Sequence, residues 1–349
     1  MKLDIPIRKQ EVSVDIDLVA SSIVQLQKTN GEIPWSKDGK TDPWDHIEAA
    51  MGLCIGSYIT EARQAYEWMV DNQLDDGSWY ASYLNEKPLD RTRETNLSSY
   101  IAVGVFHYYL ITKDIDFLEQ MWGTVRAAID FAVSLQAPTG EIYWAKSPEL
   151  EVDHMALLTG SSSIFMSLKC ALAIAKILNK KKFEWEASIN TLGHAIKNGY
   201  HLFNIVKSRY SMDWFYPVLS GALTGKEARQ CIDQYWKKFV VDGMGILCVS
   251  DQPWVTIAET SELVLALAAM GNYKLAEIVF NWVNERTFED GSYWCGFTYP
   301  DMVIWPEDKI TWTNGVVIMA ADALYQLSPA SHLFSHKFWE SSEYALDLK

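Results

Sequence analysis

The chain has 349 residues, of which 45 are acidic and 30 basic, and its net charge is −15. So acidic a chain lacks the basic surface that nucleic acids require, which excludes DNA or RNA binding as a first interpretation. Hydrophobic residues make up 49% of the chain and charged residues 21%, a balance that excludes extensive disorder and supplies a large core.

Apolar spacing and helix-breaking residues predict twelve helices and no convincing strands. Their approximate ranges are 12–28, 43–56, 59–73, 95–112, 115–136, 154–178, 184–199, 210–222, 226–238, 256–270, 272–287 and 311–327. Short links, such as Gly56–Tyr58, join several neighbours into hairpins. Six hairpins can close into an (α/α)6 toroid with six inner and six outer helices, and closure leaves no end face to cap. We therefore predict an all-α, single-domain toroid over 1–349, with its core at about 12–327 and a tail at 329–349 that packs on the outside.

A short repeat follows several of these helices. It runs from Gln27 to Trp35, from Gln73 to Trp79 and from Gln136 to Trp144, each time with a glycine four residues after the glutamine. A fourth copy, 289–294, keeps Gly291 and a Trp but has lost the glutamine. The glycine predicts a tight turn by which the chain leaves the helix.

The Gln…Asp-Gly-Ser-Trp repeat resembles the repeats of the prenyltransferase and squalene-cyclase (terpenoid cyclase) superfamily. The six-hairpin pattern is equally similar to the (α/α)6 glycosidases. Together the resemblances cover about 12–327. They imply the toroid fold, and they leave the reaction open, since this ring supports several chemistries.

Carboxylates and aromatic residues gather where the even-numbered helices begin. If these helices form the inner ring, their starts share one rim and line a funnel. Capping explains an acid at any single helix start, but it does not require Trp or Tyr beside the acid. The 15 Trp of the chain also favour an aromatic-walled cavity.

Acids that face one another in such a funnel repel and lose solvent, so some become protonated while others stay ionised. Glycosidic-bond cleavage needs this combination, and aromatic faces suit sugar rings. We therefore predict a glycoside hydrolase-like enzyme acting on a saccharide or glycolipid. The candidate catalytic residues are Asp45, Asp213 and Glu259, followed by Asp153 and Glu262. The candidate substrate-binding residues are Trp44, His46, Asn96, His154, Trp214, Tyr216, Trp254, Trp294 and Trp312.

Two alternatives stay open. A terpenoid cyclase or prenyltransferase-like protein would stabilise carbocations on the same aromatic walls, and Asp153 would take the position of the cyclase acid. However, the flanking acids of the cyclase motif are replaced, with Glu151 and His154 around Asp153. The second alternative is a non-catalytic toroid that binds a glycan or lipid.

The remaining sequence features predict an absence of cofactors. Five cysteines with no CxxC spacing indicate buried free thiols, and the Asp-x-Cys pair of zinc prenyltransferases is missing, so we expect no metal. The first ten residues do not resemble a signal peptide, and no window reaches the roughly 18 apolar residues of a membrane span. We expect a cytoplasmic enzyme with a small-molecule substrate, a saccharide or an isoprenoid; its oligomeric state is left open.

Overall fold

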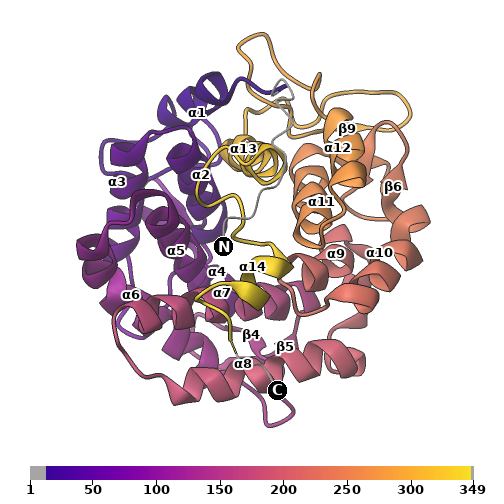
Figure 1. The fold of residues 1–349 in the computed structure, drawn as a ribbon. Coiled ribbons are helices and arrows are strands. Elements are labelled where there is room, and N and C mark those ends of the chain that lie inside the picture. The colour runs from indigo at the N-terminus through magenta and orange to yellow at the C-terminus, as the bar shows by residue number, and fades with distance from the viewer. Residues whose placement is uncertain (1–12, 347–349) are drawn as a thin grey trace.

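A computed structural model describes residues 13–346. Two concentric layers of helices form a ring (Figure 1). In chain order, the inner layer consists of α2 (Pro43–Ile55), α4 with α5 (Thr95–Ser99 and Ile101–Thr112), α7 (Leu158–Ile177), α9 (Ser211–Leu219), α11 (Ile257–Ala269) and α13 (Thr311–Tyr325). The outer layer consists of α1 (Ile16–Val24), α3 (Ile59–Asp71), α6 (Ile115–Ser134), α8 (Phe183–Asn198), α10 (Gly225–Phe239) and α12 (Tyr273–Asn281).

The ring closes where α13 packs against α2. At this seam a Cβ atom added to Gly52 would lie 2.8 Å from the Cα of Gly315, so only glycine allows the two helices to approach this closely. The predicted all-α (α/α)6 toroid is confirmed, and each predicted helix has its counterpart. The range 95–112 is divided at Tyr100 into α4 and α5.

The inner helices are buried on almost all sides. Every residue of α11 is buried, and so are twelve of the thirteen residues of α2. Among the described residues, α7 has the length and hydropathy of a membrane-spanning helix, with 94% of its most apolar window buried. Its position in the inner ring explains that composition, because both of its sides meet other helices.

The repeated Gln–Gly turns link α1 to α3, α3 to α6 and α6 to α8. The Nε2 atom of Gln73 donates to the carbonyl of Gly77 in its own turn at 2.9 Å and to that of Thr124 on α6 at 2.9 Å. Gln27 and Gln136 repeat this pattern with α3 and α8. The glycine of each turn has a positive φ, as a tight helix-exit turn requires.

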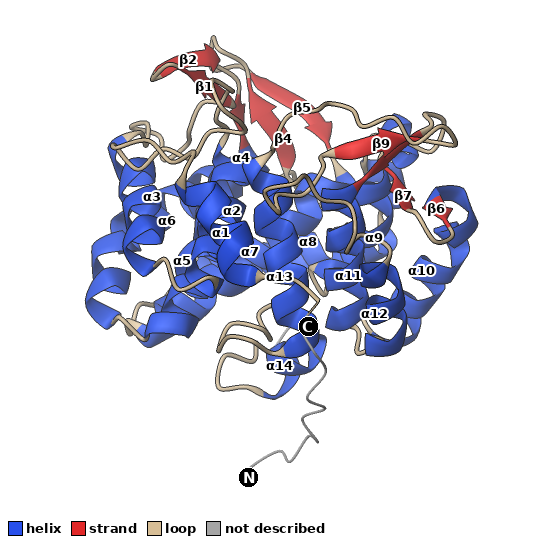
Figure 2. Cartoon of the chain, turned by 90° about the horizontal axis from the view of Figure 1, so that it is seen from above, coloured by secondary structure: helices blue, strands red, loops and turns tan. Residues whose placement is uncertain are grey.

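The prediction that the chain lacks strands was wrong. Short antiparallel strands form a β1–β2 hairpin and sheets with the orders β3-β4-β5 and β6-β7-β8-β9. Their bounds are β1 Ser82–Leu84, β2 Lys87–Asp90, β3 Arg93–Glu94, β4 Tyr143–Lys146, β5 Val152–Ala156, β6 Val240–Val241, β7 Gly245–Leu247, β8 Trp254–Thr256 and β9 Gly296–Thr298. They rise above one end of the ring (Figure 2). Their brevity, two to five residues, explains why alternation did not reveal them.

The C-terminal segment covers the opposite end of the ring, where α14 (His336–Ser341) lies (Figure 2). Trp339 packs against Phe106 of α5 with ring centroids 5.9 Å apart, and the Nε2 of His336 hydrogen-bonds the carbonyl of Val218 on α9 at 2.7 Å. The tail predicted on the outside therefore closes the ring from below and contacts inner helices.

Candidate active site

A cavity of about 360 Å³ opens at the strand-covered end of the ring. We call it the funnel. Its lining comes from the first turns of inner helices, from β1 and β2, and from the loop before α2. These residues are Lys40, Asp42, Trp44, Asp45, Ala81, Ser82, Asp90, Glu94, Asn96, Leu97, Thr159, Met212 and Trp312.

Asp42 and Asp45 are placed by the start of α2. Pro43 occupies the first turn, and the Oδ1 of Asp42 caps the helix by accepting from the backbone N–H of Asp45 at 3.0 Å. The other oxygen of Asp42 accepts from the indole of Trp35 at 2.6 Å. Burial raises the pKa of both carboxyl groups, and that of Asp45 rises well above its usual range because Asp42 and Glu48 add repulsion. The surroundings of Asp45 therefore favour its protonated form, and the neighbouring Asp42 caps the helix.

A second pair of acids lies one turn deeper. Glu48 on α2 accepts from the hydroxyl of Tyr100 at 2.6 Å and from the indole of Trp312, and burial raises its pKa to about 7. Glu262 on α11 accepts from the hydroxyl of Tyr216, and burial and then repulsion from Glu48 raise its pKa strongly. The two groups form an acidic pair that is buried behind the lining of the funnel.

Glu259 lies one turn above Glu262 on the same helix and is 6% exposed. The pKa of the Cys295 thiol is raised to about 12 by burial, then by Glu259 and Asp45. Glu259 and Asp45 are thus both close enough to the Cys295 sulfur to disfavour its thiolate form. Asp45 and Glu259 come from α2 and α11, the two helices that flank α13.

Aromatic rings form the wall beside these acids. Trp44 stacks on Tyr100 with centroids 4.0 Å apart and lies 5.8 Å from Tyr216. Trp312 faces the funnel from α13 and is held by Glu48. The wall offers flat apolar surfaces with hydroxyl and carboxyl groups at their edges, which suits a sugar ring.

The mouth of the funnel carries charged groups of both signs. Burial raises the pKa of Glu94 to about 7, and Lys40 lies 4.0 Å above the ring of Trp35. These groups can hydrogen-bond hydroxyls of a sugar chain that extends beyond the aromatic wall.

The structure brings several of the predicted site residues together. Asp45, Trp44, Asn96 and Trp312 line the funnel. Glu259, Glu262 and Tyr216 are buried and do not line the funnel themselves. Tyr216 packs against the lining residue Trp44 and donates to Glu262. A buried oxygen of Asn96, which lines the funnel, and one of Glu262, which does not, have no hydrogen-bond partner.

Asp153 and His154 do not reach the funnel. They lie exposed on β5, and the sixth predicted helix begins only at Leu158. Asp153 accepts from the N–H of Met155 at 3.0 Å, while His154 packs on Tyr143. The placement of these two residues at an inner helix start was wrong because a short hairpin precedes α7.

His46 is completely buried behind the funnel wall. Its Nδ1 accepts from the N–H of Ile33 at 3.1 Å, and its Nε2 hydrogen-bonds the carbonyl of Ala65 at 2.9 Å. Burial lowers its pKa to about 4, so the ring is neutral. With both nitrogens engaged, His46 joins the α2 region to α3 and cannot contact a ligand, contrary to the prediction.

The remaining predicted residues lie outside the funnel lining. Asp213 and Trp214 line another cavity, and Trp214 stacks on Phe239 of α10. Trp254 packs edge-to-face on Trp305 at the rim, with centroids 5.2 Å apart, and Trp294 packs similarly on Phe297. Helix starts alone did not reveal which way these side chains point.

Asp42, Glu48, Glu94 and Tyr100 are site residues that the sequence analysis left out of its candidates. The spacing contained a usable signal for Glu48, because Asp45 and Glu48 repeat the three-residue separation of Glu259 and Glu262. Within residues 13–346, no group of three or more His, Cys, Asp or Glu side chains is arranged to hold a metal ion.

Comparison with known proteins identifies the family. Over 315 residues, the chain is 45% identical to the MMP endo-(1,4)-3-O-methyl-alpha-D-mannosidase of Mycolicibacterium hassiacum, and the match covers 90% of this chain and 87% of that protein. The chain belongs to this glycoside hydrolase family. No family model matches it.

Solved structures place this glycoside hydrolase among the known toroids. A glycosidase variant in complex with glucose covers 91% of the chain and 98% of its own length, with a TM-score of 0.67 and 14% identity. The GH63 mannosylglycerate hydrolase of Thermus thermophilus gives a TM-score of 0.67 at 12% identity, covering 87% of this chain and 99% of its own. A D-mannose isomerase gives 0.70 at 10% identity, covering 91% and 98%. Such low identities establish the fold alone.

Proposed function

We propose that this glycoside hydrolase cleaves internal α-mannosidic bonds in a saccharide chain that lies across the funnel, and that Asp45 and Glu259 perform the reaction. The substrate class is suggested by the relative, an endo-(1,4)-3-O-methyl-alpha-D-mannosidase. O-methyl groups would add apolar surface to the sugar, and Trp44, Leu97 and Trp312 offer a matching apolar lining. Tyr100 stacks behind Trp44 and supports it.

The observation that carries the proposal is the position of Asp45 in the funnel lining, buried among carboxyl groups that raise its pKa. A protonated Asp45 can donate its proton to the glycosidic oxygen as the bond to the anomeric carbon breaks. Glu259 then serves as the second carboxylate, either removing a proton from the attacking water or attacking the anomeric carbon itself. Asp45 recovers its proton from water at the end of the cycle.

The deeper pair, Glu48 and Glu262, orients the walls in this proposal. Glu48 holds the edges of Tyr100 and Trp312, and Glu262 holds Tyr216. These bonds hold the rings in place before the substrate binds, which lowers the conformational entropy lost on binding.

The test compares two substrates in three proteins. Asp45→Asn should slow hydrolysis of an α-(1→4)-linked mannose oligosaccharide by about 10²–10⁴-fold, and much less for a 2,4-dinitrophenyl α-mannoside, whose leaving group needs no proton. Glu259→Gln should slow both. Equal losses on both substrates in Asp45→Asn would remove Asp45 from the acid role. The anomer first seen by NMR decides between base and nucleophile for Glu259.

A further inference from the structure

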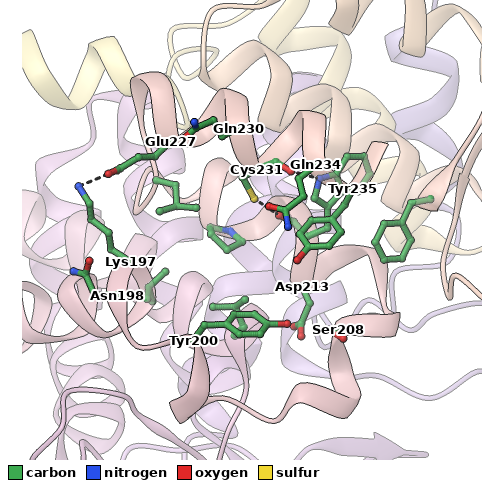
Figure 3. A pocket seen from close by; sticks show the side chains of 16 residues that line it. Lys197, Asn198, Tyr200, Ser208, Asp213, Glu227, Gln230, Cys231, Gln234 and Tyr235 are labelled. Carbon is green, nitrogen blue, oxygen red and sulfur yellow. Dashed lines mark hydrogen bonds and ion pairs between the residues drawn. The ribbon is translucent and has the colours of Figure 1, made fainter. Parts of the chain in front are cut away.

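A second cavity of about 390 Å³ lies outside the ring's central funnel, between α8, α9 and α10 (Figure 3). Its volume is within the range of about 300–1,000 Å³ that small-molecule sites occupy. Side chains of Leu158, Ile196, Trp214, Pro217, Leu223 and Phe239 supply its apolar surface. Polar groups border it as well, so it has the mixed lining of a ligand site.

The polar groups are concentrated at two ends. At one end, Asp213, Ser208 and the hydroxyl of Tyr200 lie close to one another (Figure 3). At the other end, Lys197 and Glu227 form an ion pair of 2.8 Å. The paired charges cancel, which leaves Asp213 as the charged group available to a ligand.

Asp213 has one oxygen engaged. Its Oδ1 accepts both from the N–H of Thr159 at 3.1 Å and from the hydroxyl of Thr159 at 2.5 Å. Its Oδ2 has no hydrogen bond of this kind and remains available to a donor. A carboxylate accepts hydrogen bonds from hydroxyl groups. The lysine of the lining, Lys197, is already paired with Glu227, so the cavity offers a phosphate or a carboxylate no free cation and favours a neutral, hydroxylated ligand.

The amide side chains add donors and acceptors along the cavity's opening. Asn198, Gln230 and Gln234 lie at its edge, and Tyr200 and Tyr235 present ring surface (Figure 3). Amides and one carboxylate around aromatic and aliphatic surface match a pyranose, which has hydroxyls at its edge and C–H groups on its faces.

We propose that this cavity is a second saccharide-binding site, which takes one neutral pyranose unit and is separate from the funnel. The two sites share a wall: Thr159 lines the funnel and donates to Asp213, which lines the second cavity. This inference goes beyond the proposed reaction, since it requires no catalysis in the second cavity.

The test counts the binding sites for methyl α-D-mannopyranoside by isothermal titration calorimetry, first in the unmodified protein and then in single variants that retain Asp45 and Glu259. Two sites per chain are expected. Gln234→Trp, an exposed position at the cavity's edge, should fill the cavity and weaken one site at least tenfold. Asp233→Trp places the same side chain on the adjacent exposed position, outside the lining, and should leave both sites intact.

Tyr200→Ala, at a loop position, provides a second variant and should weaken the same site several-fold. Trp312→Ala should weaken only the other site. A single site, or two sites unaffected by both Gln234→Trp and Tyr200→Ala, would overturn the inference. Turnover of an oligosaccharide is measured separately. If the protein turns over the substrate but binds methyl α-D-mannopyranoside at one site, only the second-site inference fails. If it binds at two sites but shows no turnover, only the proposed function fails.

Discussion

Trp312, on the last inner helix, donates its indole hydrogen to Glu48 on the first inner helix. The bond joins two residues 264 positions apart in the chain. It crosses the seam at which the ring closes and also holds one wall of the funnel, so closure of the fold and shape of the site depend on the same contact.

Trp312→Phe should keep the aromatic wall but leave a buried Glu48 oxygen without its donor. We expect a loss of about 1–3 kcal/mol in the free energy of unfolding, the usual effect of an unsatisfied buried group, measured by denaturant titration. Trp294→Phe is the control, because that half-buried ring packs on Phe297, while the indole that donates to Glu48 belongs to Trp312. Equal losses in the two variants would contradict the role of the Glu48 bond.

Asp42 controls the acidity of Asp45. Its charge is the largest repulsion acting on Asp45 after burial. Asp42→Asn removes that charge and still offers an oxygen to cap α2, so the pKa of Asp45 should fall. Because the proposed reaction needs protonated Asp45, the alkaline limb of kcat/KM should move to lower pH by about one unit. Asp90→Asn, exposed at the funnel's mouth, should leave that limb in place.

The Gln–Gly turns can be tested for their contribution to stability. Gln73→Ala removes two hydrogen bonds to backbone carbonyls and should cost about 1–3 kcal/mol. Gly77→Ala should cost more, since φ is +88° and the new Cβ would lie 2.2 Å from the carbonyl oxygen of Ala127. Gly123→Ala, in open space on α6, is the control and should stabilise by about 0.5–1 kcal/mol. Denaturant titration compares the three, and a similar loss in all of them would refute the role of the turn.

Lys169 makes docking of the tail dependent on pH. Its Nζ donates to the carbonyl of Ser220 at 2.9 Å beneath Trp339, and burial lowers its pKa from 10.5 to about 7. Between pH 7 and 10.5 the unfolded chain protonates Lys169 and the folded protein does not. Lys169 therefore adds no penalty to the free energy of unfolding above pH 10.5, and the penalty grows as the pH falls towards 7. Between about pH 7 and 10, the stability of the unmodified protein should therefore rise relative to Lys169→Met, by up to about 1.4 kcal/mol per pH unit.

The measurement for Lys169 is chemical unfolding at about pH 7, 8.5 and 10, which spans the range between its folded and unfolded pKa. His336 also lies beside Lys169, but burial lowers the pKa of this histidine below 6.5, so it stays neutral over that range. A difference between the two proteins that stays constant with pH would show that Lys169 does not change its charge on folding.

The features that could be predicted from the sequence are those with a local signal, such as helical apolar spacing or a helix start. Helices of nine or more residues have several turns of apolar spacing, so the ring was visible in the sequence. The strands have two to five residues, and the hairpin that carries Asp153 and His154 was taken as the start of a helix. For Asp45 and Trp312, a helix start pointed correctly to the funnel. For His46 and Trp214, side-chain direction depends on the outer helices they pack against, which periodicity does not reveal.

The packing of α14 across the lower end of the ring limits how a long polymer can be processed. With α14 at the opposite end (Figure 2), a saccharide bound as proposed enters and leaves the funnel from the strand-covered end.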